Sequence, residues 1–162
     1  YNTMTYSSEN LIRFKLKADK TLDLRNDGKV QLESNYYNFD SAAGIIYTVD
    51  VSKPDGDKVT IISMADGTPF DVNKMYTIAT SSYRGNGGGG HLTKGCGLSP
   101  EQIKARLVYS SDKDIRFYIM KWIEENKVIT PKSLNLWNVV PADWVKEASA
   151  RDAELMFGKQ IK

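Results

Sequence analysis

The sequence contains few of the residues that cross-link chains or hold metal ions. Its 162 residues include one cysteine, Cys96, and one histidine, His91. A single cysteine excludes a disulfide bond within the chain. Hydrolytic centres with two metal ions need several converging histidine and carboxylate ligands, and no H-x-D or D-x-H pattern is present. The sequence therefore predicts neither a catalytic residue nor a metal ligand in this chain.

An excess of charge of one sign and long apolar runs are also lacking. Lys and Arg total 22 and Asp and Glu total 20, which leaves a formal net charge of +2. This balance argues against a nucleic-acid partner held by phosphate neutralisation. No apolar run approaches the roughly 20 residues that a membrane-spanning helix needs. With 41% hydrophobic and 26% charged residues, residues 1–162 are expected to form a single globular domain.

Alternation of apolar and polar residues marks the strands of the first half. It predicts strands over 45–51 and 59–62, joined by a turn, and a third strand over 75–83. Strands with such short connections predict an antiparallel meander. The segment 11–16 alternates as well and is compatible with a strand, whereas residues 1–9 are polar without a period and predict a loop.

Helix signals dominate the second half. Ser99 followed by Pro100 predicts a helix that runs to about residue 108. Ser111 and Asp114 resemble an acidic capping box ahead of an apolar stripe at helical spacing. A last helix is predicted over 143–157. The fold class is therefore α+β, with an antiparallel or mixed sheet flanked by helices.

A run of four glycines, Gly87–Gly90, directly follows the third predicted strand. A phosphate-binding P-loop would end in Gly-Lys-Ser/Thr, but here His91, Leu92 and Thr93 follow. The spacing of the glycines from Gly85 onward fits G-x-G-x-x-G, yet no helix begins at once, as a dinucleotide fingerprint requires. Two interpretations remain, a flexible surface loop and a backbone that approaches a ligand closely.

Two segments together resemble a known family. Residues 81–90 read Ser-Ser-Tyr-Arg-Gly-Asn-Gly-Gly-Gly-Gly, and residues 37–45 read Tyr-Asn-Phe-Asp-Ser-Ala-Ala-Gly-Ile. Both are similar to the motifs of the C-terminal domain of 5'-nucleotidases and 2',3'-cyclic-nucleotide phosphodiesterases. The resemblance extends over residues 36–140, including the hairpin between the two motifs. It implies the α+β fold of that C-terminal domain.

The resemblance also implies how a substrate is held. In this family two aromatic rings, one from each motif, clamp the nucleotide base. Tyr83 matches the ring beside the glycines. Phe39 matches the other ring best, and Tyr37 is the alternative if the first motif is shifted by two residues. A stack of one ring on a base contributes about 1–3 kcal/mol whatever the base.

The remaining residues of the second motif are further candidates for substrate binding. Gly87, Gly88 and Gly89 would let the backbone pass close to the ligand without side chains in the way. Asn86 either holds the turn with its side-chain amide or reaches the sugar. Arg84 either approaches a phosphate or is a solvated surface arginine.

The sequence departs from the family pattern at three places. The nucleotidases have Asp where this chain has Gly89, and an aromatic residue where it has His91. A lone histidine is more often structural than catalytic, and both roles stay open for His91. The family also supplies arginines for phosphate binding from the region before the first motif. Only Arg13 and Arg25 are available there, and neither can be matched.

The resemblance finally implies what lies outside the chain. We expect residues 1–162 to be a C-terminal fragment, inactive by itself, of a phosphoric ester hydrolase. Its partners would be a nucleotide or nucleoside and an N-terminal metallophosphatase domain that holds two divalent metal ions. The expected location is periplasmic or at the cell surface. The alternative function is a non-enzymatic extracytoplasmic module that binds a sugar or a peptide.

Overall fold

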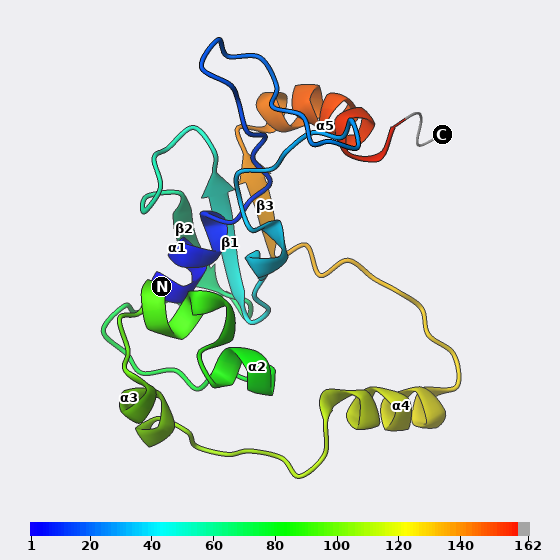
Figure 1. Cartoon of the computed structure of the whole chain (residues 1–162). Coiled ribbons are helices and arrows are strands. Elements are labelled where there is room, and N and C mark those ends of the chain that lie inside the picture. Colours follow the sequence, from blue (N-terminus) through cyan, green and yellow to red (C-terminus); the bar gives the residue numbers. More distant parts are fainter. Residues whose placement is uncertain (159–162) are drawn as a thin grey trace. The chain divides into compact units, whose positions relative to one another are not determined.

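The computed structural model describes residues 1–158, which separate into two units (Figure 1). The first unit comprises Tyr1–Phe70 together with the chain from Leu136 onward, and the second comprises Asp71–Asn135. The first motif therefore belongs to the first unit, and the glycine run belongs to the second.

Among the described residues, no helix is long and apolar enough to cross a bilayer.

A three-stranded mixed sheet forms the centre of the first unit. Its strands are β1 (Ile45–Asp50), β2 (Val59–Met64) and β3 (Trp137–Val140), in the order β2-β1-β3. β1 pairs antiparallel with β2 and parallel with β3. The predicted hairpin and the α+β class with a mixed sheet are confirmed.

The core lies on one face of this sheet. Tyr47, Val49 and Val59 are its fully buried apolar side chains, at 0%, 1% and 2% exposure. The period-2 spacing of Tyr47 and Val49 places both on the same face of β1. Six partly buried residues pack around them: Met4, Leu11, Ala42, Ile45, Ile61 and Trp137. The Tyr47 ring stacks on the Trp137 ring, with centroids 5.9 Å apart and 10° between the planes.

The predicted third strand over 75–83 is wrong. Residues 75–80 have no regular structure, and α2 (Ser82–Gly85) begins soon after them. The side chains of Met75 and Ile78 are 84% and 63% exposed, so the segment has no buried face to hold against a sheet. β-propensity is only a tendency to fit a half-buried pleated surface. The free edge of β1 is occupied instead by β3, whose four residues carry too short a pattern to be recognised alone.

The N-terminal loop predicted over residues 1–9 is also wrong, since α1 spans Asn2–Ser8. Its sequence is polar, but Ser7 and Ser8 are buried and Met4 packs on the core. Tertiary contacts thus stabilise a helix that has no apolar stripe of its own. The alternating segment 11–16 forms isolated bridges rather than a continuous strand, at Phe14–Leu32 and Leu16–Leu22. A third bridge, Leu24–Val30, closes a short hairpin around residues 26–28.

The three predicted helices are confirmed, and capping side chains explain where two of them begin. Ser99 and Gln102 form a full capping box at α3 (Pro100–Ala105). Asp114 caps α4 (Ile115–Asn126) by accepting from the backbone N–H of Phe117. Ser111 does not cap it, because its hydroxyl donates to Lys113 O at 2.6 Å. The last helix is α5 (Ala142–Phe157), and short turns of helix complete the list: η1 (Tyr36–Asn38), η2 (Gly88–Gly90) and η3 (His91–Gly95).

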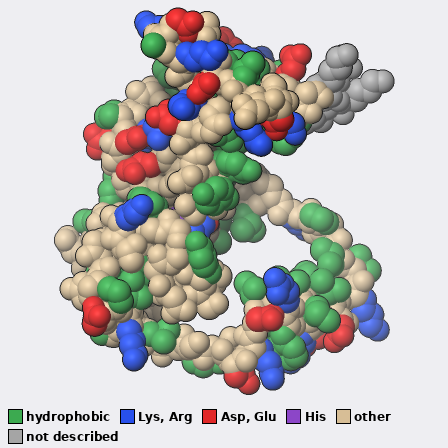
Figure 2. All heavy atoms as spheres, viewed as in Figure 1, with side chains coloured by type: hydrophobic (Ala, Val, Ile, Leu, Met, Phe, Trp, Pro, Cys, Tyr) green, Lys and Arg blue, Asp and Glu red, His purple; other side chains and the backbone are tan. Residues whose placement is uncertain are grey.

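The apolar stripe of α4 lies at the surface of the second unit. Its side chains at Ile115, Tyr118, Ile119, Trp122 and Ile123 are between 37% and 63% exposed. Figure 2 shows hydrophobic side chains spread along this helix. The helix therefore forms where it is predicted, with Asp114 rather than Ser111 as its cap, but its apolar stripe is not buried within its own unit.

We expect Asp55 to contribute a pH-dependent part of the stability. Hydrogen bonds from Lys58 and Arg13 hold the pKa of its carboxyl below the usual value. The ion pair with Arg13 connects segment 11–16 to the β1–β2 turn, and the ion pair with Lys58 lies within that turn. A lowered pKa means that this stability is present above the unfolded value near 4 and is lost as the pH falls through the folded value. Asp55→Asn should cost at most about 1 kcal/mol at pH 7, because the carboxyl is partly exposed.

The measurement is thermal unfolding followed by circular dichroism at pH 7 and at pH 2.5. The difference in Tm between Asp55→Asn and the wild type should be largest at pH 7 and vanish in acid. Asp57→Asn, two residues further along the same turn, is the matched control and should leave Tm unchanged at both values. A difference that persists in acid would show that the Asp55 charge is not its cause.

Candidate functional site

Tyr83 lies on a single helical turn at the start of the glycine motif. Ser81 caps this turn, α2, by accepting from the backbone N–H of Arg84. The Tyr83 side chain is 63% exposed. The Arg84 guanidinium lies over the Tyr83 ring, 5.4 Å from its centroid, within the range of a cation–π contact. A large aromatic ring is therefore held at the surface of the second unit by a locally determined turn.

The glycines that follow fold back against this ring. Gly87, Gly89 and Gly90 have φ values of 91°, 74° and 90°, a left-handed conformation that favours glycine. A Cβ atom at Gly88 would lie 2.6 Å from both the Tyr83 ring and the Tyr83 carbonyl oxygen. The Arg84 Nη1 atom also donates to Gly88 O at 3.4 Å. The glycine run thus closes on α2, and close approach to Tyr83 requires glycine at position 88.

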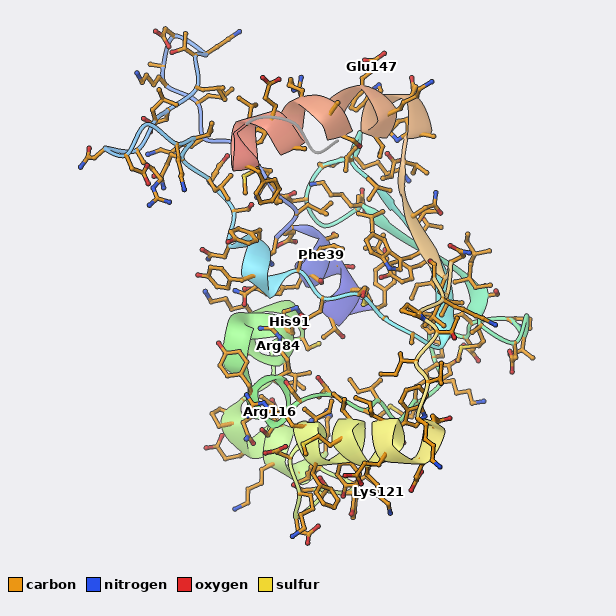
Figure 3. All side chains as sticks on the ribbon, turned by 90° about the vertical axis from the view of Figure 1, so that its right-hand side faces the viewer. Phe39, Arg84, His91, Arg116, Lys121 and Glu147 are labelled. Carbon is orange, nitrogen blue, oxygen red and sulfur yellow. The ribbon has the colours of Figure 1, made fainter. Side chains whose placement is uncertain are left out.

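The neighbours of the run have more local roles. Asn86 ends α2, where its backbone N–H closes the turn by donating to Ser82 O at 2.9 Å. His91 begins η3 and is only 4% exposed, inside the second unit (Figure 3). Arg84 and the ring of Tyr83 are therefore the large side chains that this motif presents at the surface.

The first motif exposes the ring of Tyr37 at the surface, although Phe39 is the residue that matches the family best. η1 is closed by hydrogen bonds from Asn38 N to Asn35 O and from Phe39 N to Tyr36 O, at 2.7 and 3.0 Å. Tyr37, in the middle of this turn, is 68% exposed, and its hydroxyl donates to Asn35 Oδ1 at 3.2 Å.

Phe39 points toward the core instead. Its ring lies 5.4 Å from the Trp137 ring, with 49° between the planes, and Trp137 in turn stacks on Tyr47. The side chain is partly buried. Of the two candidates in the first motif, Tyr37 is the more exposed, with the Tyr36 ring edge-on to it at 5.8 Å, whereas Phe39 packs with the aromatic residues of the core.

A pocket of about 640 Å³ lies beside Tyr37 in the first unit. Tyr36 and Tyr37 line it, together with Arg25, Lys29–Leu32 and Ser34 of the hairpin and Leu155–Phe157 at the end of α5. Phe39 is not among the lining residues. The charged lining residues are Arg25 and Lys29, both cationic, and Arg25 forms an ion pair with Asp27 at 3.2 Å. The pocket thus combines tyrosine rings with positive charge.

The hairpin contributes the residues that sequence reasoning missed. Tyr36 and Lys29 were not predicted as site residues, and Arg25 could not be matched to a role. The Asn-Asp-Gly turn at residues 26–28 was a usable signal, because it implies a hairpin that carries Arg25 and Lys29 on its two arms. The position of that hairpin beside Tyr37 is set by long-range contacts and has no local signal.

The described residues do not fit a metal centre. Within residues 1–158, no three or more His, Cys, Asp or Glu side chains are placed to hold an ion. The structure brings together Tyr83, Arg84 and Gly87–Gly89 in the second unit and the candidate rings Tyr37 and Phe39 in the first. These groups can stack on a planar ligand and attract an anion.

Comparison with known proteins agrees with the two motifs. The family described as "5'-nucleotidase, C-terminal domain" matches residues 8–94. The chain is 32% identical over 116 residues to the trifunctional nucleotide phosphoesterase protein YfkN of Bacillus subtilis. It is 31% identical over 120 residues to a 2',3'-cyclic-nucleotide 2'-phosphodiesterase/3'-nucleotidase of Salmonella typhimurium.

Both alignments cover 65% of this chain, but they cover only 7% and 17% of the two relatives, which are far longer proteins. No solved structure matches the chain. The family match extends over more than half of the sequence and includes both motifs. The chain belongs to the family of 5'-nucleotidase C-terminal domains.

Proposed function

We propose that this chain is the substrate-binding part of a longer nucleotide phosphoesterase, with Tyr37 of the first unit and Tyr83 of the second as its candidate stacking rings. The observation that carries the proposal is that each motif holds one tyrosine ring, at 68% and 63% exposure, on a hydrogen-bonded turn. Both relatives are named as enzymes that act on nucleotides. Membership of the family supports the same role for this chain.

The choice of Tyr37 over Phe39 rests on packing. A ring that stacks on a base must offer one whole face to it. Phe39 is partly buried against Trp137, so moving it toward a ligand would disrupt the aromatic contacts of the core. Tyr37 needs no such movement, since it already lines an open pocket.

The glycine motif supports Tyr83 in the same role. A ring that is fixed before the ligand arrives loses little conformational entropy on binding. Arg84 covers the ring on one side and the backbone of Gly88 approaches it closely. Positive φ values at Gly87 and Gly89 make that approach possible. In this proposal the glycines hold the ring in place, and their backbone lies close to the bound ligand.

Positive charge near Tyr37 suits a phosphorylated ligand. Arg25 and Lys29 line the same pocket as this ring, and both attract phosphate. Arg13, the other arginine of this region, is engaged by Asp55 at 2.9 Å. Arg25 also forms an ion pair, with Asp27 at 3.2 Å. It is the better of the two arginines for contact with a nucleotide because it lines the pocket of Tyr37, as Lys29 does, whereas Arg13 does not.

Hydrolysis is assigned to another part of the protein. The described residues hold no ligand set for metal ions, and the relatives are much longer than this chain. We propose that a metallophosphatase domain of the same protein binds the two divalent metal ions and carries out the chemistry. The periplasmic or cell-surface location remains part of this proposal and rests on the family resemblance.

The first prediction is that the chain alone is hydrolytically inert. Incubation with AMP, UMP or a 2',3'-cyclic nucleotide, with added Mn²⁺ or Zn²⁺, should release no phosphate above background. The complete protein should release phosphate under the same conditions. The reason is the missing ligand set for a two-metal centre. Turnover by the chain alone would overturn the division of labour between domains.

A second prediction tests whether the rings of Tyr37 and Tyr83 each contribute to nucleotide binding. In the complete protein, Tyr37→Ala and Tyr83→Ala should each weaken nucleotide binding by about 1–3 kcal/mol, the contribution of one stack. Tyr37→Phe and Tyr83→Phe should be nearly silent, because the ring and not the hydroxyl makes the contact. Dissociation constants from isothermal titration calorimetry provide the measurement.

Phe39→Leu is the matched control for the first motif. It should lower Tm through lost packing against Trp137, and it should weaken nucleotide binding less than Tyr37→Ala does, because the Tyr37 ring is still present. Affinity that falls with Phe39→Leu but not with Tyr37→Ala would assign the stack to Phe39. A neutral oligosaccharide should bind none of these variants, and strong binding of it would favour a sugar-binding module.

A third prediction concerns the close approach of Gly88 to Tyr83. Gly88→Ala should displace the Tyr83 ring, because the new Cβ would meet its ring and carbonyl oxygen at 2.6 Å. Nucleotide affinity should then fall about as far as with Tyr83→Ala. Gly85→Ala is the control, since its Cβ would meet only the Thr80 methyl group at 3.7 Å, an ordinary contact. Equal effects of the two substitutions would contradict a specific role for Gly88.

A further inference from the structure

The loop between η1 and β1 bonds to other backbone groups at its two ends, from Phe39 N to Tyr36 O and from Ala65 N to Gly44 O. Residues 39–44, between η1 and β1, contain no regular secondary structure. Polar backbone groups in such a segment must find other partners when they are removed from water. Two buried hydroxyl groups, each from a different element, provide partners for this loop.

Ser7, on α1, provides the first of them. Its hydroxyl donates to Asp40 O at 2.7 Å and accepts from the backbone N–H of Asp40 at 2.7 Å. The Ser7 side chain is 0% exposed, so water does not compete for these bonds. One side chain thus satisfies both the donor and the acceptor of a single residue, as a neighbouring strand would do. The backbone at Asp40 is fixed in position and in direction.

Tyr47, on β1, provides the second anchor. Its hydroxyl accepts from the backbone N–H of Ala42 at 3.1 Å, and the residue is fully buried. Burial raises the pKa of Tyr47 against the effect of the hydrogen bond from Ala42. The hydroxyl is therefore neutral at physiological pH. Its ring stacks on Trp137, which contacts Phe39, so the loop is held at Phe39, Asp40 and Ala42.

Tyr37 depends on these anchors for its position. Its side chain is 68% exposed, so it packs little against the core. The η1 turn connects it rigidly to Phe39 through the hydrogen bond from Phe39 N to Tyr36 O. The direction of the exposed ring therefore follows that of the anchored backbone just after it.

We propose that Ser7 is a positioning residue for nucleotide binding, which acts by fixing the loop that presents the Tyr37 ring. This inference rests on the proposed function of Tyr37. Without the Ser7 hydroxyl, the loop samples other conformations, and the fraction of molecules with the ring correctly placed falls. The apparent affinity falls by the same fraction. Tyr47 supports the same loop through Ala42.

Ser8 offers a matched control on the same helix. It is also buried, at 1% exposure, and its hydroxyl makes one hydrogen bond of 2.7 Å. That bond ends on Thr5 O, within α1, and does not reach the loop. Ser7→Ala and Ser8→Ala therefore remove the same atom from neighbouring buried positions and differ in what the hydroxyl holds.

The experiment measures AMP binding by calorimetry and the hydrogen exchange of residues 36–44 without ligand, both on the complete protein. Ser7→Ala should bind AMP about tenfold more weakly and exchange faster over this segment, if about one molecule in ten keeps the ring in place. Ser8→Ala should match the wild type in affinity, within about twofold, and in exchange over the segment. Unchanged affinity or exchange in Ser7→Ala, or equal effects of both variants on either one, would overturn the proposal.

Two further variants keep the outcome interpretable. Tyr47→Phe retains the ring and removes the hydroxyl, so it should loosen the same segment even if Ser7→Ala fails to fold. An unchanged segment in Tyr47→Phe would count against anchoring by buried hydroxyls. Tyr37→Ala separates the two proposals. If it leaves AMP affinity unchanged, the stacking role fails, while faster exchange in Ser7→Ala would still show that Ser7 holds the loop.

Discussion

The stack of Tyr47 on Trp137 connects the sheet of the first unit to the loop that bears its candidate site. Tyr47 lies on the central strand β1 and Trp137 on the parallel strand β3, so their rings join two strands that are far apart in the sequence. The Tyr47 hydroxyl holds Ala42, and Trp137 contacts Phe39. Only three apolar side chains are fully buried among the described residues. With a core this small, the first motif is held by this aromatic contact together with the hydrogen bonds of the Ser7 and Tyr47 hydroxyls.

Aromatic residues serve two purposes in this chain, and burial separates them. Phe39, Tyr47 and Trp137 form a connected group that packs, because contact with other rings and removal from water stabilise them. Tyr37 and Tyr83 keep most of their surface in water, on turns that are closed by hydrogen bonds. Rings that are already exposed on ordered turns lose little conformational entropy when a ligand binds. This contrast is what favours Tyr37 over Phe39 for the stack.

Substrate binding and chemistry are divided in the proposed function. The described part of the chain offers rings, a folded glycine run and a positively charged pocket, but no set of metal ligands. In the proposed function, this domain binds a nucleotide, and a partner domain that holds metal ions carries out the hydrolysis. The two named relatives are long enough to contain such a partner, since this chain covers 7% and 17% of their lengths.

The sequence by itself determined the elements whose signals are local, and the family. The β1–β2 hairpin follows from alternation around Pro54-Asp55-Gly56, and α3 and α4 begin at residues with capping side chains. The two motifs identified the family from sequence alone. Tertiary structure decided the rest, because edge pairing and burial depend on which distant segment reaches a surface. It placed β3 on the free edge of β1, folded the polar residues 2–8 into α1, turned Phe39 inward, and left the ring of Tyr37 exposed.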